Sequence, residues 1–254
     1  MRIAIAAWSF RAERWHRPAM LGLAAVILAV LAWEVAHLGG WVAQATALTP
    51  WGDHTYLREV ALGWVSGDPL YPTRQLAGPY QLGGLDVLYP PAAMALLLPA
   101  LLLPPALWLA IPLGVVAGIT VLWRPSPIAW AAIAVCSLAP GTIIEVHQAN
   151  PVLWVTAAIA VGTRWRPAFA FVLVKPSLLI FALPGIRSRG WWHACALAGA
   201  ASLAFWPLTI EWLVSVLNAR GPRSGLLYSL LDVPLLAIPL IAWAGAERPS
   251  RAPP

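Results

Sequence analysis

Charged residues are scarce in this chain of 254 residues. Asp, Glu, Lys and Arg together make up 10% of the sequence, and lysine occurs once, at Lys175. An ordinary soluble domain carries about 25% charged residues, so the composition excludes a typical soluble protein. Hydrophobic residues reach 60% and the mean hydropathy is +0.74. These values predict an integral membrane protein.

Two further shortages narrow the class of function. The two cysteines, Cys136 and Cys195, lie in apolar stretches without the spacing of a zinc site or a disulfide framework. The sixteen basic residues are scattered between apolar runs, without the dense basic tract of a nucleic-acid-binding protein. We therefore expect no nucleic-acid partner. No tight cluster of carboxylates or histidines calls for a metal ion.

Long apolar runs are what the sequence has in abundance. They are continuous and lack the alternation of lipid-facing strands, so we predict an all-α, polytopic bundle of transmembrane helices. One span takes about 20 residues, which leaves room for about seven or eight. The predicted spans are 19–38, one or two within 92–122, 128–138, 152–161, 168–183, 192–206 and 226–243.

The number of spans depends on the prolines between residues 92 and 122. Pro104 and Pro105 deny backbone donors and disrupt a regular helix, which favours two helices joined by a turn and eight spans in all. A single kinked helix, giving seven spans, is the alternative. Arginine counting does not separate the two layouts, because the split is eight inside against seven outside in the first and nine against six in the second. In the first layout the cytoplasmic arginines are Arg2, Arg11, Arg14, Arg17, Arg187, Arg189, Arg248 and Arg251.

The chain is expected to form one membrane domain, residues 19–245. The four arginines ahead of the first apolar run place the N-terminal segment 1–18 in the cytoplasm. The tail 246–254 is polar and proline-rich and should be disordered. This orientation puts the loop 39–91, the longest stretch that lipid could not accommodate, outside the cytoplasm.

That loop is predicted to carry an interfacial helix from residue 54 to residue 66. Apolar side chains recur at helical spacing there, the pattern of an amphipathic helix lying at a membrane surface; they are Leu57, Val60, Ala61 and Trp64. Gly67-Asp68-Pro69 should end the helix by turn chemistry. Asp53 directly precedes it, and two roles stay open: capping the helix start or acting as a catalytic base.

Two polar features occur at membrane depth. The run EVHQAN at 145–150 joins two spans, and Lys175-Pro176 interrupts the apolar run 168–183. A lysine within a bilayer costs about 2.5–3.5 kcal/mol on insertion scales, so Lys175 should face the bundle interior or a water-filled cavity. The structural alternatives are a polar connector for 145–150 and pairing of Lys175 with a carbonyl.

Five features in order resemble glycosyltransferase family 87, the polyprenol-phosphate-dependent mannosyltransferases of the C-type superfamily of membrane glycosyltransferases. They are Asp53 after the first span, Gly-Asp-Pro-Leu-Tyr at 67–71, Tyr-Pro-Pro at 89–91, the pair Gln148 and Asn150, and Lys175-Pro176. The resemblance covers about residues 19–225. Its departures are His147, where the family usually has glycine, and a chain shorter than most members.

The resemblance implies an inverting enzyme of the bacterial plasma membrane. It would move a hexose, mannose in that family, from a polyprenyl-phosphate donor to a hydroxyl of a lipid or glycan acceptor outside the cytoplasm, without a further cofactor. Asp53 would be the general base, and cations would stabilise the departing phosphate. The candidate substrate-binding residues are His54, Arg58, Arg74, Tyr89, His147, Gln148, Asn150 and Lys175.

Two alternatives from other classes stay open. A transporter or flippase-like protein could use Lys175, Glu145 and His147 to line a path, although the sequence contains no inverted repeat. A catalytically silent protein could be built on the same core. Sugar transfer and substrate transport are distinguished by whether a glycosidic product forms.

Overall fold

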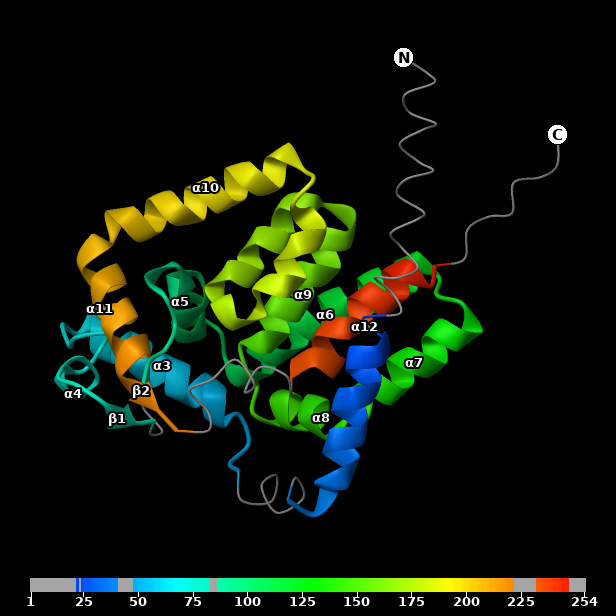
Figure 1. The fold of residues 1–254 in the computed structure, drawn as a ribbon, viewed down its shortest axis with the longest axis horizontal. Coiled ribbons are helices and arrows are strands. Elements are labelled where there is room, and N and C mark those ends of the chain that lie inside the picture. Colours follow the sequence, from blue (N-terminus) through cyan, green and yellow to red (C-terminus); the bar gives the residue numbers. More distant parts are fainter. Residues whose placement is uncertain (1–21, 23, 41–47, 83–85, 222–231, 247–254) are drawn as a thin grey trace.

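The computed structural model describes residues 22, 24–40, 48–82, 86–221 and 232–246. In this part the chain is mostly helical, which agrees with the predicted all-α class, and a two-stranded parallel sheet is added. The N-terminal segment 1–18, parts of the loop 39–91, and the tail after residue 246 lie outside the described residues. The elements, shown in Figure 1, are the helix Ala24–Ala36, α3 (Gly52–Val65), α4 (Thr73–Leu76), β1 (Tyr80–Gln81), η1 (Pro91–Ala93), α5 (Met94–Leu102), α6 (Pro105–Trp123), α7 (Pro127–Ser137), α8 (Pro140–His147), α9 (Val152–Arg164), η2 (Arg166–Val174), η3 (Pro176–Gly185), α10 (Arg189–Ala204), α11 (Trp206–Asn218), β2 (Ala219–Arg220) and α12 (Val233–Ala244).

The double proline separates two helices, as predicted. α5 ends at Leu102 and α6 begins at Pro105, where a residue without a backbone N–H is tolerated. α5 has nine residues and is therefore about 14 Å long. The apolar core of a bilayer is thicker, at about 30 Å. Within the described residues α6 alone is long and apolar enough to cross a membrane, and counting each of the bent pairs α7–α8 and α10–α11 as one span gives three. The total of eight spans stays a prediction.

α6 and α9 run side by side in the same direction. Near the start of α6, the indole N–H of Trp108 donates to the carbonyl of Ala149 at 2.9 Å. At the end of α6, the indole N–H of Trp123 donates to the hydroxyl of Thr163 at 2.8 Å. The bundle therefore has two ends, which we call the site end, at Ala149, and the arginine end, at Thr163. α12 packs against α6, α7 and α9.

The predicted span 168–183 is not one helix. η2 and η3 are 3-10 helices that pack against each other as a hairpin, with Lys175 at the turn. The two outer ends of the hairpin meet where Arg166 donates to the carbonyl of Pro184 at 3.4 Å. Pro176 explains the break, because proline disfavours a helical backbone in the residue before it, and Lys175 has φ −127° and ψ 84°.

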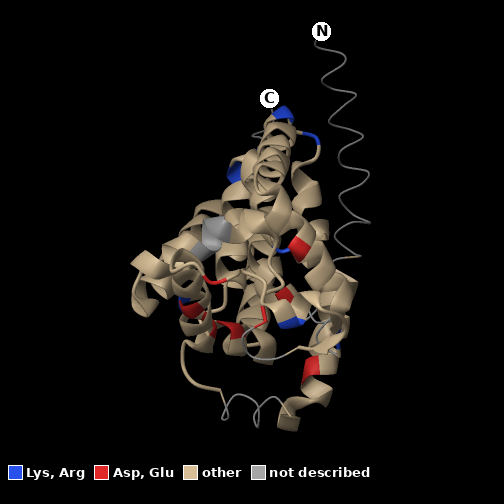
Figure 2. Cartoon of the chain, turned by 90° about the vertical axis from the view of Figure 1, so that its left-hand side faces the viewer, with Lys and Arg blue, Asp and Glu red and all other residues tan. Residues whose placement is uncertain are grey.

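The hairpin gathers arginines at one end of the bundle. Arg124 follows the last residue of α6, Arg164 ends α9 over the ring of Trp123, and the start of α10 lies against the start of η2. The arginine end accordingly carries Arg124, Arg164, Arg166, Arg187 and Arg189. The eight-span layout separated these residues because it treated 168–183 as a crossing helix. In Figure 2 most acidic segments lie in the lower half of the molecule, together with some basic ones, whereas basic segments lie nearest the C-terminus.

A helix is confirmed at the predicted position as α3, and its location at a membrane surface stays a prediction. It buries His54, Leu57 and Ala61 and ends before Gly67, whose φ of 102° is a left-handed conformation that suits glycine. Beyond it, β1 pairs in parallel with β2, so the first loop is joined to the end of α11.

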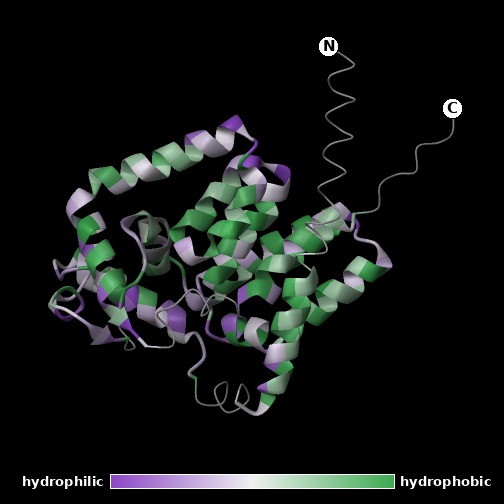
Figure 3. Cartoon of the chain, in the orientation of Figure 1, coloured by the Kyte–Doolittle hydropathy of each residue, from purple (hydrophilic) through white to green (hydrophobic). Residues whose placement is uncertain are grey.

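The outer surface of the helices is strongly apolar. On α10, Trp192, Leu197 and Leu203 are 56%, 72% and 66% exposed. Figure 3 shows hydrophobic ribbon along much of α10 and α11. A large exposed apolar surface marks a membrane or protein contact, which is consistent with membrane association.

Candidate functional site

Asp53 and Asn150 meet at the site end. The side-chain amide of Asn150 donates to Oδ2 of Asp53 at 2.5 Å, and its Oδ1 accepts the backbone N–H of Val152 at 2.8 Å. The second bond orients the amide, since only its oxygen can accept from Val152. The capping alternative for Asp53 is wrong, because the cap position of α3 is occupied by Trp51 and no side chain caps the helix. The carboxylate of Asp53 instead makes a tertiary contact.

The segments that carry Asp53 and Asn150 are bonded to each other. The backbone N–H of Asp53 donates to the carbonyl of Gln148 at 3.1 Å, and the side chain of Gln148 donates to the carbonyl of Thr49 at 2.8 Å. A Cβ atom on Gly52 would lie 2.5 Å from Oε1 of Gln148. The absence of a side chain at Gly52 is therefore what lets the two segments come so close.

A residue with a left-handed backbone conformation lies two positions before Asp53 and one position before Asn150. Trp51 has φ 61° and Ala149 has φ 51°, values that are uncommon outside glycine. This conformation costs about 1–2 kcal/mol per residue and persists where the surroundings impose it, often at functional sites. Here the backbone N–H of Trp51 donates to His147 at 2.8 Å, and the buried Ala149 is held through its carbonyl by Trp108.

His147 does not disturb the turn, although the family that the sequence resembles usually has glycine at this position. It is the last residue of α8 and has a helical backbone, so it needs none of the conformational freedom of glycine. The left-handed position of the turn is Ala149. Nδ1 of His147 lies 3.3 Å from Nε2 of Gln148, which places the imidazole beside the segment that holds Asp53.

Lys175 reaches the same end of the bundle from the turn of the η2–η3 hairpin. Its Nζ forms an ion pair with Oδ2 of Asp232 at 2.5 Å, and the two side chains are 11% and 3% exposed. Lys175 and Asp232 both lie within electrostatic range of Asp53. The interior-facing position expected for Lys175 is thus observed, and a carboxylate is its ion-pair partner.

Two more acidic residues belong to this cluster. Neither was among the candidate catalytic or substrate-binding residues predicted from the sequence. Asp232 directly precedes α12, and Glu145 lies on α8 within electrostatic range of Asp53, Lys175 and Asp232. Oε2 of Glu145 is buried and has no hydrogen-bond partner in the described part of the chain. The sequence does distinguish Asp232, because it is the one charged residue in the apolar run 226–243, and a charged residue within a membrane segment often marks a functional site.

The electrostatic surroundings of Asp53 favour a proton acceptor. Burial raises the pKa of Asp53 above its ordinary value, while the hydrogen bond from Asn150 and the charge of Lys175 lower it and the charge of Asp232 raises it. A general base is most effective when its pKa approaches the working pH. The net upward shift therefore makes this carboxylate a stronger base than an exposed aspartate.

Three predicted substrate-binding residues have other surroundings. His54 is buried, with Nε2 3.0 Å from the carbonyl of Leu103 and its ring 5.5 Å from that of Trp108. Arg58 is exposed on α3 and makes no hydrogen bond or ion pair with the described residues. Tyr89 is half-buried, and its carbonyl accepts the hydroxyl of a neighbouring tyrosine at 2.6 Å.

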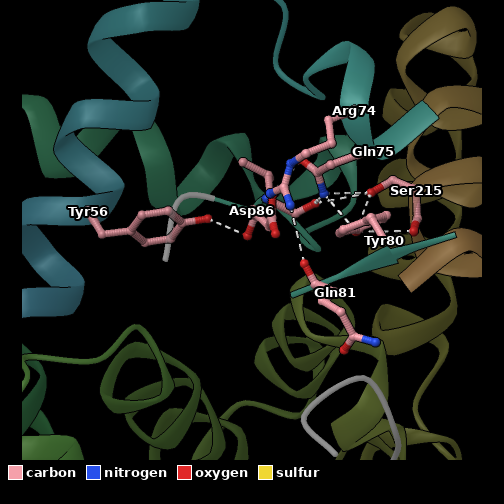
Figure 4. Close-up of polar contacts among 8 residues, drawn as sticks. Tyr56, Arg74, Gln75, Tyr80, Gln81, Asp86 and Ser215 are labelled. Carbon is pink, nitrogen blue, oxygen red and sulfur yellow. Dashed lines mark hydrogen bonds and ion pairs between the residues drawn. The ribbon is translucent and has the colours of Figure 1, made fainter. Parts of the chain in front are cut away.

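Arg74 belongs to a separate network that anchors the first loop on α11 (Figure 4). Its guanidinium pairs with Asp86 and lies 5.4 Å from the centre of the Tyr80 ring. The adjacent Gln75 is fully buried and donates to the hydroxyl of Tyr80 at 2.8 Å and to that of Ser215 at 2.9 Å. Arg74 is thus engaged in holding the loop together and does not contact Asp53.

No protein-family model, curated protein or solved structure matches the chain. The resemblance to glycosyltransferase family 87 rests on the five sequence features alone. Within the described residues no group of three or more His, Cys, Asp or Glu side chains has an arrangement that could hold a metal ion. Function is therefore argued from Asp53, Asn150, Lys175 and their neighbours.

Proposed function

We propose that the protein is an inverting membrane glycosyltransferase with Asp53 as its general base. It would transfer a hexose, mannose by the family resemblance, from a polyprenyl-phosphate donor to a hydroxyl of a lipid or glycan acceptor. The observation that carries the proposal is the convergence of three separate segments: Asp53 is bonded to Asn150 and lies within electrostatic range of Lys175.

The proposed reaction assigns one task to each of these groups. Asp53 takes the proton of the acceptor hydroxyl while the hydroxyl oxygen attacks the anomeric carbon from the face opposite the phosphate. The bond between that carbon and the phosphate oxygen breaks, and its electron pair leaves with the polyprenyl phosphate. Lys175 stabilises the growing negative charge on the phosphate, and Asn150 keeps the carboxylate in place.

The distribution of arginines supports an extracytoplasmic site. Five of the eight arginines in the described residues occupy the arginine end, opposite Asp53, and an excess of basic residues marks the cytoplasmic side of a membrane protein. α3, which carries Asp53, would then lie at the outer membrane surface. The exposed apolar sides of α6, α10 and α11 would contact lipid.

The decisive experiment measures transfer of labelled sugar from a polyprenyl-phosphate donor by the full chain in proteoliposomes. Asp53→Asn should reduce the rate by about 10²-fold or more, the usual contribution of a general base. Glu59→Gln is the matched control, because Glu59 is an exposed carboxylate on the same helix. Full activity of Asp53→Asn would remove Asp53 as the base. Movement of a substrate across sealed vesicles without a glycosidic product would instead support the transporter alternative.

A further inference from the structure

The ion pair of Lys175 and Asp232 connects the η2–η3 hairpin to α12, two elements that also meet where the guanidinium of Arg166 lies 4.7 Å from the ring centre of Trp243. Lys175 is the turn of the η2–η3 hairpin, and Asp232 occupies the cap position of α12. An aspartate at that position commonly accepts backbone N–H groups of its own helix. Here no side chain caps α12, and the carboxylate bonds to Nζ of Lys175 at 2.5 Å.

Two further carboxyl groups lie within electrostatic range of this pair. They are Asp53 on α3 and Glu145 on α8. Together with Asp232, three carboxyl groups are thus near one ammonium group. An anionic ligand that approaches Lys175 competes with Asp232 for it and is repelled by every carboxylate that stays ionised.

We propose that Asp232 is a specificity-determining residue that holds Lys175 until a phosphate-bearing ligand replaces it, and that the released Asp232 carboxyl takes up a proton. The inference rests on the proposed function, which supplies the phosphate ligand. The step is balanced, since one ammonium–carboxylate pair is exchanged for one ammonium–phosphate pair and a proton from water neutralises the buried carboxylate. A polyprenol without phosphate carries no charge that could displace Asp232.

The burial of Asp232 gives the direction of the proton movement. The side chain of Asp232 is 3% exposed, and in the ion pair its charge is balanced by the ammonium group of Lys175. When Lys175 turns to the phosphate, the buried carboxylate loses this cation, and burial then favours its neutral, protonated form. Phosphate binding should therefore weaken as the pH increases, because a proton becomes harder to take up.

The test titrates the full chain in lipid nanodiscs with a short-chain polyprenyl monophosphate. Calorimetry in two buffers of different ionisation enthalpy, at several pH values between about 6 and 9, measures the protons taken up with the ligand. The wild type should take up close to one proton, and its affinity should fall by up to tenfold per pH unit. Asp232→Asn should bind the phosphate several-fold more tightly and lose the proton uptake, whereas Lys175→Gln should bind it weakly.

Glu145→Gln separates the two buried carboxylates that could take the proton. Proton uptake that persists in Asp232→Asn but disappears in Glu145→Gln overturns the proposal, as does weaker binding in Asp232→Asn, which would mean that Asp232 only positions Lys175. If Asp232→Asn does not fold, Asp232→Glu and the wild type still provide the test, and absence of proton uptake in the wild type overturns the exchange.

The same data distinguish this inference from the proposed function. Phosphate binding with proton uptake but without sugar transfer would leave the exchange standing and overturn the glycosyltransferase. Sugar transfer without proton uptake would overturn the exchange alone. A wild type that binds no polyprenyl phosphate would overturn both.

Discussion

The side-chain amide of Asn150 donates a 2.5 Å hydrogen bond to the carboxylate of Asp53, across 97 positions of sequence. The same amide is oriented by the backbone N–H of Val152 at 2.8 Å. A carboxylate held in this way keeps one direction toward its target, and loss of such orientation slows a reaction even when the reacting group remains.

Replacing Asn150 by alanine should therefore slow sugar transfer with little effect on donor binding. We expect kcat to fall by about 10- to 100-fold and the KM for the donor to change little, because the bond orients the base rather than the substrate. Steady-state kinetics on the full chain in proteoliposomes measure both constants. Glu59→Gln, at an exposed site on α3, is the control, and a wild-type kcat in Asn150→Ala would remove the positioning role.

The pH dependence of transfer should report the raised pKa of Asp53. A base must be ionised, so the rate should fall as the pH drops through the pKa of Asp53, at a pH above the ordinary aspartate value of about 3.9. In Asn150→Asp the added negative charge should move this midpoint higher still. A midpoint at or below about 3.9 in the wild type would contradict the assignment.

The stability of Asp53→Asn should differ from that of the wild type in a pH-dependent way. Because burial raises the pKa of Asp53 in the folded protein, ionising it lowers the free energy of unfolding as the pH rises through that pKa. The uncharged amide escapes this penalty. We expect the thermal midpoint of Asp53→Asn to equal or exceed that of the wild type near pH 7 and the advantage to vanish below the unfolded value of about 3.9; a lower midpoint at pH 7 would contradict the prediction.

Gly52→Ala should disturb the site through one identifiable contact. The new Cβ would lie 2.5 Å from Oε1 of Gln148, so the glutamine must move and lose its bond to Thr49. Transfer should slow by about tenfold, equivalent to about 1.4 kcal/mol. In a Gln148→Ala background the same substitution should have little further effect, which a double-mutant cycle measures. Additive losses would mean that Gly52 acts by another route.

Gln75→Ala should loosen the first loop from α11. Gln75 is fully buried, and the hydroxyls of Tyr80 and Ser215 both accept from it. Leaving such groups unsatisfied costs about 1–3 kcal/mol. Hydrogen exchange should accelerate in β1 and β2 while α6 and α9 remain protected. Gln81→Ala, at an exposed position in β1, is the matched control, and equal protection of β1 in both variants would contradict the anchoring role.

Local chemistry predicted those elements whose limits depend on neighbours in sequence. The break at Pro104-Pro105 follows from missing backbone donors, and the end of α3 before Gly67 follows from turn chemistry. Hydropathy predicted where apolar segments lie but not how they cross. The run 168–183 has the composition of a span, yet Pro176 and packing against the neighbouring helix make it a hairpin.

In the candidate site, too, the sequence predicted some features and the tertiary structure alone decided others. By itself the sequence determined that the chain is an apolar helical protein in which Asp53, Asn150 and Lys175 are exceptional, because a polar group within apolar surroundings needs a partner. Only the tertiary structure decided the partners: Asn150 for Asp53, Asp232 for Lys175, and Asp86 for Arg74. Residues so far apart in sequence meet through helix packing, and packing depends on the combined shape and charge of many side chains, which no local pattern specifies.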